Sequence, residues 1–75
     1  MNEKFNMNDI DTLQFEKEHY TIAKAEQWLI DYGLSKKVKK CNITTNFIIV
    51  ELNQTYRDYT LLIIDHIHMF VKKSY

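Results

Sequence analysis

Residues 21–33 read TIAKAEQWLIDYG and form the best-marked element of the sequence. Thr21 suits the N-cap of a helix, and Gly33 suits the left-handed position that follows a helix C-terminus. Between them, apolar residues recur at the spacing of one helical face: Ile22, Ala25, Leu29 and Tyr32, with Trp28 beside them. We therefore predict a helix over residues 22–32.

Outside this helix, the apolar residues indicate strands. Residues 43–52 are rich in Ile, Val, Thr and Phe, which predicts a strand buried on both faces or at an interface. Residues 59–71 fit either a helical face or a β-branched strand, and we choose the strand because the polar connection 53–58 favours a hairpin with 43–52. Leu13 and Phe15 alternate with polar residues and suggest a short strand, although Asn8 as an N-cap with Ile10 and Leu13 would start a helix equally well.

The length of 75 residues allows one domain, and the chain has no proline and one glycine to mark a linker. We expect residues 1–8 to form a flexible N-terminal arm and residues 9–75 to form a single α+β domain. Its order is β-α-β-β, with one helix packed on a short antiparallel-rich sheet. Such a sheet has two edges and an open face, and strands this hydrophobic favour pairing with another chain.

A chain of this size buries only about 60% of its unfolded surface, so small domains often rely on disulfides, metals or partners. The single cysteine, Cys41, excludes an internal disulfide and suits a reducing compartment. We find no secretory signal and no apolar stretch of membrane-spanning length, so we expect a cytoplasmic protein without a membrane partner. A partner protein is then the remaining source of extra stability.

The formal net charge is zero, but the charges are separated along the chain. Residues 1–34 carry seven acidic and three basic side chains, and residues 35–75 carry three acidic and seven basic ones. The plain explanation is solvated surface charge. The alternative is a small nucleic-acid-binding protein whose basic cluster contacts phosphates. Its candidate residues are Lys36, Lys37, Lys39, Lys40, Arg57, Lys72 and Lys73.

Metal-competent side chains gather at Asp65, His66 and His68. In a strand the two histidines share a face and Asp65 points to the opposite one, so only two ligands converge where zinc needs three or four. His19 supplies a third only if the fold brings it across. We therefore expect no metal and no other cofactor.

Catalysis has even less support in the sequence. The lysines around Cys41 would lower the pKa of its thiol, but no residue is identifiable that orients the thiol or forms an oxyanion hole. One glycine cannot build a phosphate-binding loop. We therefore expect that the protein is not an enzyme.

Elimination favours recognition by a surface. We expect a protein-interaction module that binds a protein partner, or itself as a homodimer, through a sheet edge or face. The candidate contact residues lie on the two predicted C-terminal strands: Phe47, Ile49, Glu51, Tyr59, His66, His68 and Phe70. For Phe47 and Ile49 a place in the ordinary core is the alternative.

In its small size and its Asn/Lys/Ile-rich composition, the chain resembles the small proteins encoded by phages and mobile elements. These often inhibit host or defence proteins by occupying a surface. The resemblance is one of composition, and it implies an inhibitor that blocks a partner protein sterically.

Overall fold

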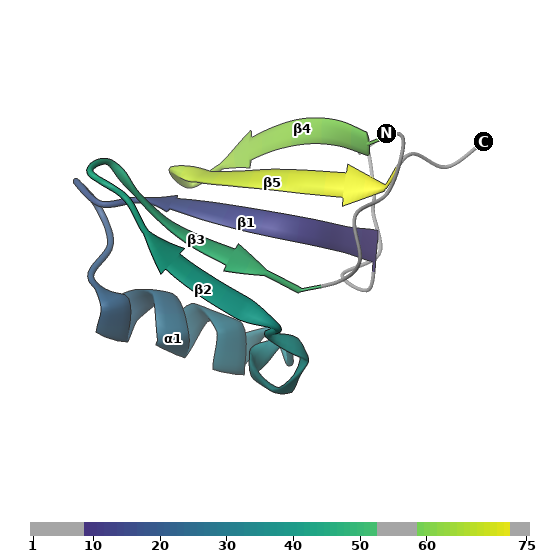
Figure 1. Ribbon diagram of the computed structural model, residues 1–75, viewed down its shortest axis with the longest axis horizontal. Helices are drawn as coiled ribbons and strands as arrows, with labels where there is room; N and C mark the ends of the chain where they lie inside the picture. Colours follow the sequence, from purple (N-terminus) through teal and green to yellow (C-terminus); the bar gives the residue numbers. More distant parts are fainter. Residues whose placement is uncertain (1–8, 53–58, 73–75) are drawn as a thin grey trace.

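The computed structural model describes residues 9–52 and 59–72, which form an antiparallel sheet of five strands with one helix against it (Figure 1). The predicted arm, residues 1–8, lies outside the described residues. The elements in chain order are β1 (Ile10–Glu16), α1 (Ile22–Asp31), the 3₁₀ helix η2 (Ser35–Lys37), β2 (Lys40–Ile43), β3 (Phe47–Glu51), β4 (Tyr59–Ile64) and β5 (Ile67–Lys72). The predicted α+β class is confirmed.

Helix α1 begins and ends close to where the sequence predicts. The Thr21 hydroxyl accepts a hydrogen bond from the Lys24 amide at 3.1 Å, which caps the first turn. The helix ends at Asp31, and Gly33 follows with a φ of 73°, a left-handed conformation that glycine adopts without steric cost. The Leu34 amide then donates to the Leu29 carbonyl at 2.8 Å and turns the chain back toward the sheet.

Only part of the predicted apolar helical face is buried. Ala25 and Leu29 lie in the core, and Trp28 packs against it. Ile22 and Tyr32, which share the predicted face, are each 50% exposed. Both lie at an end of the short helix α1, Ile22 as its first residue and Tyr32 as its C-cap.

Strand β1 lies at the centre of the sheet, whose order is β2-β3-β1-β5-β4. The short strand predicted around Leu13 and Phe15 is therefore confirmed, and the helical alternative is wrong. Phe15 is fully buried and lies opposite Ile48 of β3 and Ile67 of β5. Its ring also meets Trp28 of α1 edge to face.

The prediction of one strand over residues 43–52 is wrong, because this stretch contains the turn of a hairpin. Strand β2 ends at Ile43 and β3 begins at Phe47. The Thr44 hydroxyl accepts from the Phe47 amide at 3.0 Å, and the Thr44 amide donates to the Phe47 carbonyl at 2.8 Å. These bonds close the chain on itself before the apolar run begins.

Residues 59–71 are also a hairpin rather than one strand. Asp65 and His66 form its two-residue turn with φ values of 52° and 65°, the left-handed pair that tight hairpins use. The choice of strand over helix is confirmed. The predicted hairpin with 43–52 is wrong, because β1 and β5 lie between β3 and β4. The tight turn lets β5 return beside β1 with Ile67, Met69 and Val71 buried.

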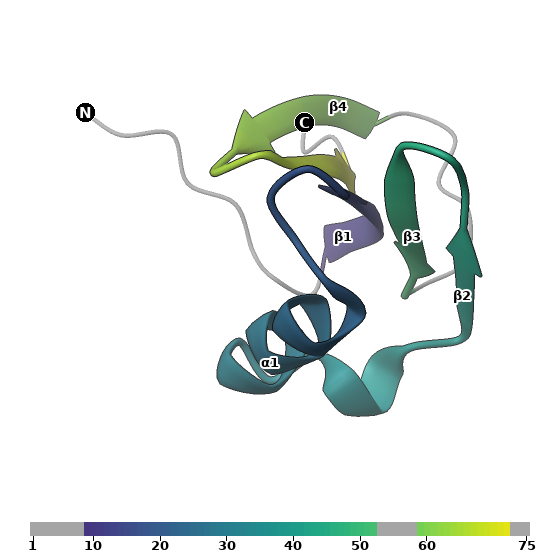
Figure 2. The ribbon, with the colours of Figure 1, turned by 90° about the vertical axis from the view of Figure 1, so that its left-hand side faces the viewer.

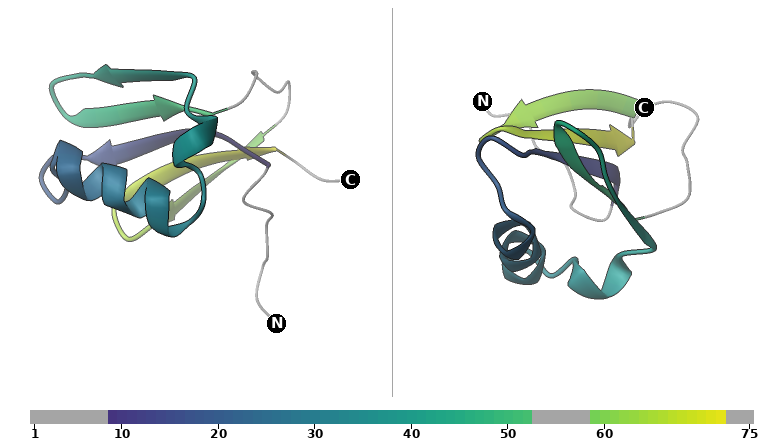
Figure 3. Two further views of the ribbon diagram at one scale, coloured as in Figure 1. Left: turned by 90° about the horizontal axis from the view of Figure 1, so that it is seen from below. Right: turned by 60° about the vertical axis from the view of Figure 1, so that its left-hand side comes forward.

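Within the described part of the chain, helix α1 covers one face of the sheet and leaves the other without a helix. Figure 2 shows the sheet curving from β4 past β1 and β3 to β2, with α1 below it. Figure 3 (left) shows the same arrangement from the helix side. The buried apolar residues form one cluster: Ile10, Leu13, Phe15, Ala25, Leu29, Leu34, Ile48, Val50, Leu52, Ile67, Met69 and Val71.

Candidate functional site

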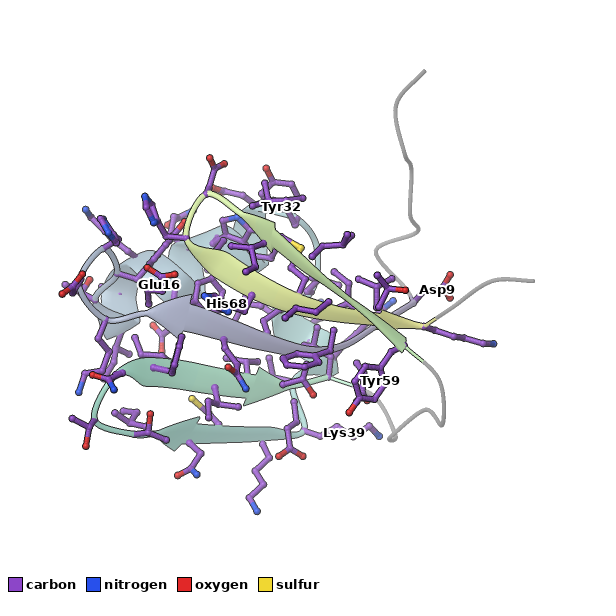
Figure 4. The ribbon with its side chains drawn as sticks, turned by 90° about the horizontal axis from the view of Figure 1, so that it is seen from above. Asp9, Glu16, Tyr32, Lys39, Tyr59 and His68 are labelled. Atoms are coloured by element: carbon purple, nitrogen blue, oxygen red, sulfur yellow. The ribbon has the colours of Figure 1, made fainter. Side chains whose placement is uncertain are left out.

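The face of the sheet that points away from α1 is called here the helix-free face. Because side chains alternate along a strand, the residues between the buried ones belong to it. Figure 4 looks onto this face and shows Glu16 and His68 in front of the sheet. By strand register the helix-free face comprises Thr12, Gln14, Glu16, Lys40, Asn42, Phe47, Ile49, Glu51, Tyr59, Leu61, Ile63, His68, Phe70 and Lys72.

Six of the seven candidate contact residues lie on the helix-free face, and the seventh, His66, is exposed in the β4–β5 turn. Phe47 and Ile49 are half-buried and stand outside the cluster of buried core residues. On the other side of β1, the ring of Phe70 meets that of Tyr59 edge to face. The structure therefore places these side chains on one face, over β3, β5 and β4, with β1 between β3 and β5.

The edge strand β4 exposes the largest apolar side chains of the sheet. Tyr59, Leu61, Ile63 and Ile64 are 41%, 47%, 58% and 43% exposed. None of the described residues pairs with the outer edge of this strand. Its sequence, YTLLII, contains no charge and no proline, so the edge carries none of the usual obstacles to strand pairing.

The structure does not gather the candidate basic residues into one patch. Lys36 and Lys37 lie in η2, and Lys40 lies on β2 directly opposite Glu51. Lys72 is on β5, three strands away from β2. Lys39 precedes β2, and its amide donates to the Glu51 carbonyl at 2.8 Å. Arg57 and Lys73 fall outside the described residues. Nucleic-acid binding stays a prediction: four of the described lysines lie in or beside η2 and β2, and Lys72 lies apart from them on β5.

One carboxylate, Glu16, stands among all three histidines of the chain. His68 Nε2 lies 2.8 Å from Glu16 Oε2. On the other carboxylate oxygen, Glu16 Oε1, His66 Nδ1 lies at 3.4 Å and His19 Nε2 at 4.0 Å. The rings of His19 and His66 stack with centroids 3.6 Å apart. We call these four residues the Glu16 cluster.

Two turns build the Glu16 cluster. After β1 the His19 amide donates back to the Glu16 carbonyl at 3.0 Å, which returns His19 to the end of the strand. Across the sheet the Glu16 amide donates to the His66 carbonyl at 3.1 Å. The Tyr20 hydroxyl donates to the Asp65 carbonyl at 2.9 Å and ties the two turns together. The fold thus brings His19 across to the other two histidines, the condition that the sequence left open.

The surroundings favour the charged form of Glu16. The hydrogen bond with His68 is the largest effect and lowers the pKa of the Glu16 carboxyl. Desolvation opposes it, and the charges of His66, His68 and His19 lower the pKa further. The ring of His68 also meets Phe47 edge to face, with centroids 5.1 Å apart. His68 is therefore held on two sides, while the side chains of His66 and His19 are 56% and 43% exposed.

Cys41 lies apart from every histidine in an apolar hollow of about 360 Å³ between α1 and β2. Ala25, Leu29, Val38 and Val50 line the same hollow. The thiol is free and Cys41 is exposed. Among the described residues, no imidazole lines this hollow.

The comparisons with protein-family models, with curated protein sequences and with solved structures found no match for this chain. Within the described ranges 9–52 and 59–72, no helix is long and apolar enough to cross a membrane. The site must therefore be interpreted from its own geometry.

Sequence reasoning missed two features of these surfaces. It did not select Leu61, Ile63 and Ile64, although six consecutive uncharged residues at 59–64 were the available signal. It also missed Glu16 as the centre of the histidines. The spacing of Glu16 and His19 was visible, but the approach of His66 depends on strand pairing between residues far apart in sequence.

Proposed function

We propose that this protein is a non-enzymatic interaction module that binds by adding a strand to the open edge of β4. Strand addition gives affinity through backbone hydrogen bonds and gives specificity through alternate side chains. The observation that carries the proposal is the exposure of Tyr59, Leu61 and Ile63 along an edge with no charge. Phe70, which lies opposite Leu61, extends the same apolar surface onto β5.

The partner we propose is a second copy of this chain. The formal net charge of zero does not oppose self-association, and β4 brings no like charges together. A two-fold axis normal to the sheet pairs the two edges antiparallel. It sets Leu61 opposite the partner's Leu61 and Tyr59 opposite the partner's Ile63, an aromatic and β-branched pair that favours strand pairing.

In a chain whose β4 edge is not paired with a second copy, the same edge suits the inhibitor role that composition suggests. An inhibitor of the phage or mobile-element type acts by covering a surface of its target, and an edge strand can supply the backbone bonds for this. The exposed free thiol of Cys41 supports a reducing compartment such as the cytoplasm.

The proposal is tested by light scattering of the full chain over a wide range of concentration. We expect the mass of two chains, insensitive to salt because the interface is apolar. Ile63→Lys places a charge on the pairing edge and is expected to give a monomer. The matched control is Ile43→Lys on the opposite edge strand, where the isoleucine is 49% exposed and the dimer should persist.

A cross-link tests the register. In a Cys41→Ser background, Leu61→Cys should form a disulfide between two copies under mild oxidation, because the two positions face each other across the axis. Ile43→Cys in the same background should not. A monomeric parent protein, or equal cross-linking at the two positions, would contradict the pairing of β4 with itself.

A further inference from the structure

The Glu16 cluster has the composition of a metal site. Imidazole nitrogen and carboxylate oxygen together suit zinc and its neighbours among the divalent transition metals. One ligand atom each from Glu16, His19 and His66 lies within 4.8 Å of the others. No other group of this kind occurs among the described residues.

The distances are close to those that a bound ion imposes. In a tetrahedral zinc site with bonds of about 2.1 Å, neighbouring ligand atoms are about 3.4 Å apart. Glu16 Oε1 already lies 3.4 Å from His66 Nδ1 and 4.0 Å from His19 Nε2. Both imidazoles belong to exposed residues, so their side chains have room to rotate out of the stacked arrangement and direct one nitrogen each toward the ion.

His68 has the position of an outer partner. It contacts Glu16 Oε2, whereas His66 and His19 approach Glu16 Oε1. A hydrogen bond of this kind fixes the orientation of a ligating carboxylate. Because Phe47 contacts the His68 ring, this orientation is supported by the sheet itself.

The conformation of His66 is an independent observation. Its φ of 65° lies in the left-handed region, at the turn position where glycine or asparagine is favoured. Glycine would form this turn with less strain, and it would bring no side chain to Glu16. Backbone strain of this kind is typical of functional residues, and here the strained residue brings its imidazole to Glu16.

From this geometry we propose that Glu16, His19 and His66 bind one divalent transition-metal ion, with zinc as the representative ion and His68 as a positioning residue. Three protein ligands leave the fourth tetrahedral position to water. The ion joins the end of β1 to the β4–β5 turn, which directly follows the edge strand β4.

Calorimetric titration of the full chain with zinc chloride at neutral pH tests the proposal. The Cys41→Ser background excludes binding by the thiol. We expect one zinc ion per chain, with binding abolished by His19→Ala and by His66→Gly. His68→Gln should weaken binding by about 10-fold to 100-fold, the range for loss of an outer hydrogen bond.

His66→Gly separates metal binding from folding. Glycine suits the turn, so the thermal midpoint of the zinc-free variant should stay level or rise while zinc binding is lost. Glu18→Gln is the matched control, since it removes a carboxylate near the cluster but outside it and should bind zinc like the parent. A parent that does not bind zinc, or His19 and His66 variants that bind it as Glu18→Gln does, would overturn the site.

Discussion

The two edges of the sheet differ in almost every property that controls strand pairing. Strand β2 has four residues, includes Lys40 and follows the lysines of η2 and Lys39. Strand β4 has six residues, no charge and exposed Leu61 and Ile63. Natural sheets protect their edges by short strands and by lysine, so β2 is a protected edge and β4 is an open one.

This asymmetry determines what self-association can produce. A protein with one open edge pairs once and closes as a two-fold dimer, because the paired edges are consumed. A protein with two open edges can add strands without end. The difference between β2 and β4 therefore fits a closed dimer rather than a filament.

The largest effect on stability is expected in β1, the central strand between the two edges. Phe15→Ala removes a fully buried ring from β1 and should lower the free energy of unfolding by about 3–5 kcal/mol. That is comparable to the whole stability of a domain of this size, about 4–11 kcal/mol. Urea unfolding followed by the fluorescence of Trp28 measures it.

The control for the central strand is Phe70→Ala. Phe70 lies on the helix-free face of β5 and is only half-buried, so its loss should cost clearly less. Equal losses for Phe15 and Phe70 would mean that the two faces of the sheet contribute alike, contrary to the burial described here.

A second prediction removes the protection of β2. Lys40→Val gives this edge an apolar β-branched residue and should convert the dimer into larger assemblies, which light scattering detects as masses above two chains. Lys24→Val adds the same side chain on exposed helix α1 and serves as control. If both variants remain dimers, the lysine is not what closes the β2 edge.

Local signals explain which parts of the fold the sequence could predict. Helix α1 was predictable because its cap at Thr21 and its end at Gly33 depend on neighbouring residues alone. The alternation of Phe47, Ile49 and Glu51 likewise placed them on one face, since every second residue of a strand shares a face.

The strand order was not predictable by the same means. It depends on β1 inserting between β3 and β5, a long-range pairing that no local pattern records. The turn at Asp65 and His66 was also not predicted from the sequence, because its left-handed residues are not the glycine or asparagine that mark such turns. The Glu16 cluster depends on both the strand order and this turn, so it could not be predicted while they were unknown.

The smallest effect is expected at Asp11, where β1 pairs differently with β3 on one side and with β5 on the other. The pairing of β1 with β3 is continuous from Thr12, whereas its pairing with β5 shifts register between Ile10 and Thr12. Asp11 is buried at this irregularity, and its backbone carbonyl accepts a hydrogen bond from the Leu52 amide at 2.9 Å. Charge is thus held inside the sheet where the β5 side cannot pair regularly.

Burial raises the pKa of the Asp11 carboxyl above its ordinary value of 3.8, and the charge of Glu51 raises it further, while the Thr12 hydroxyl lowers it. A raised pKa in the folded state means that the ionised carboxyl destabilises the fold. This cost is absent below pH 3.8, grows as pH rises through the folded-state pKa and is complete above it. Asp11→Asn should therefore raise the urea midpoint at neutral pH but not below pH 3.8, and exposed Glu18→Gln should change it little at either pH. An Asn variant that is less stable at neutral pH would show that the buried carboxylate supports the irregular side of β1 instead of weakening it.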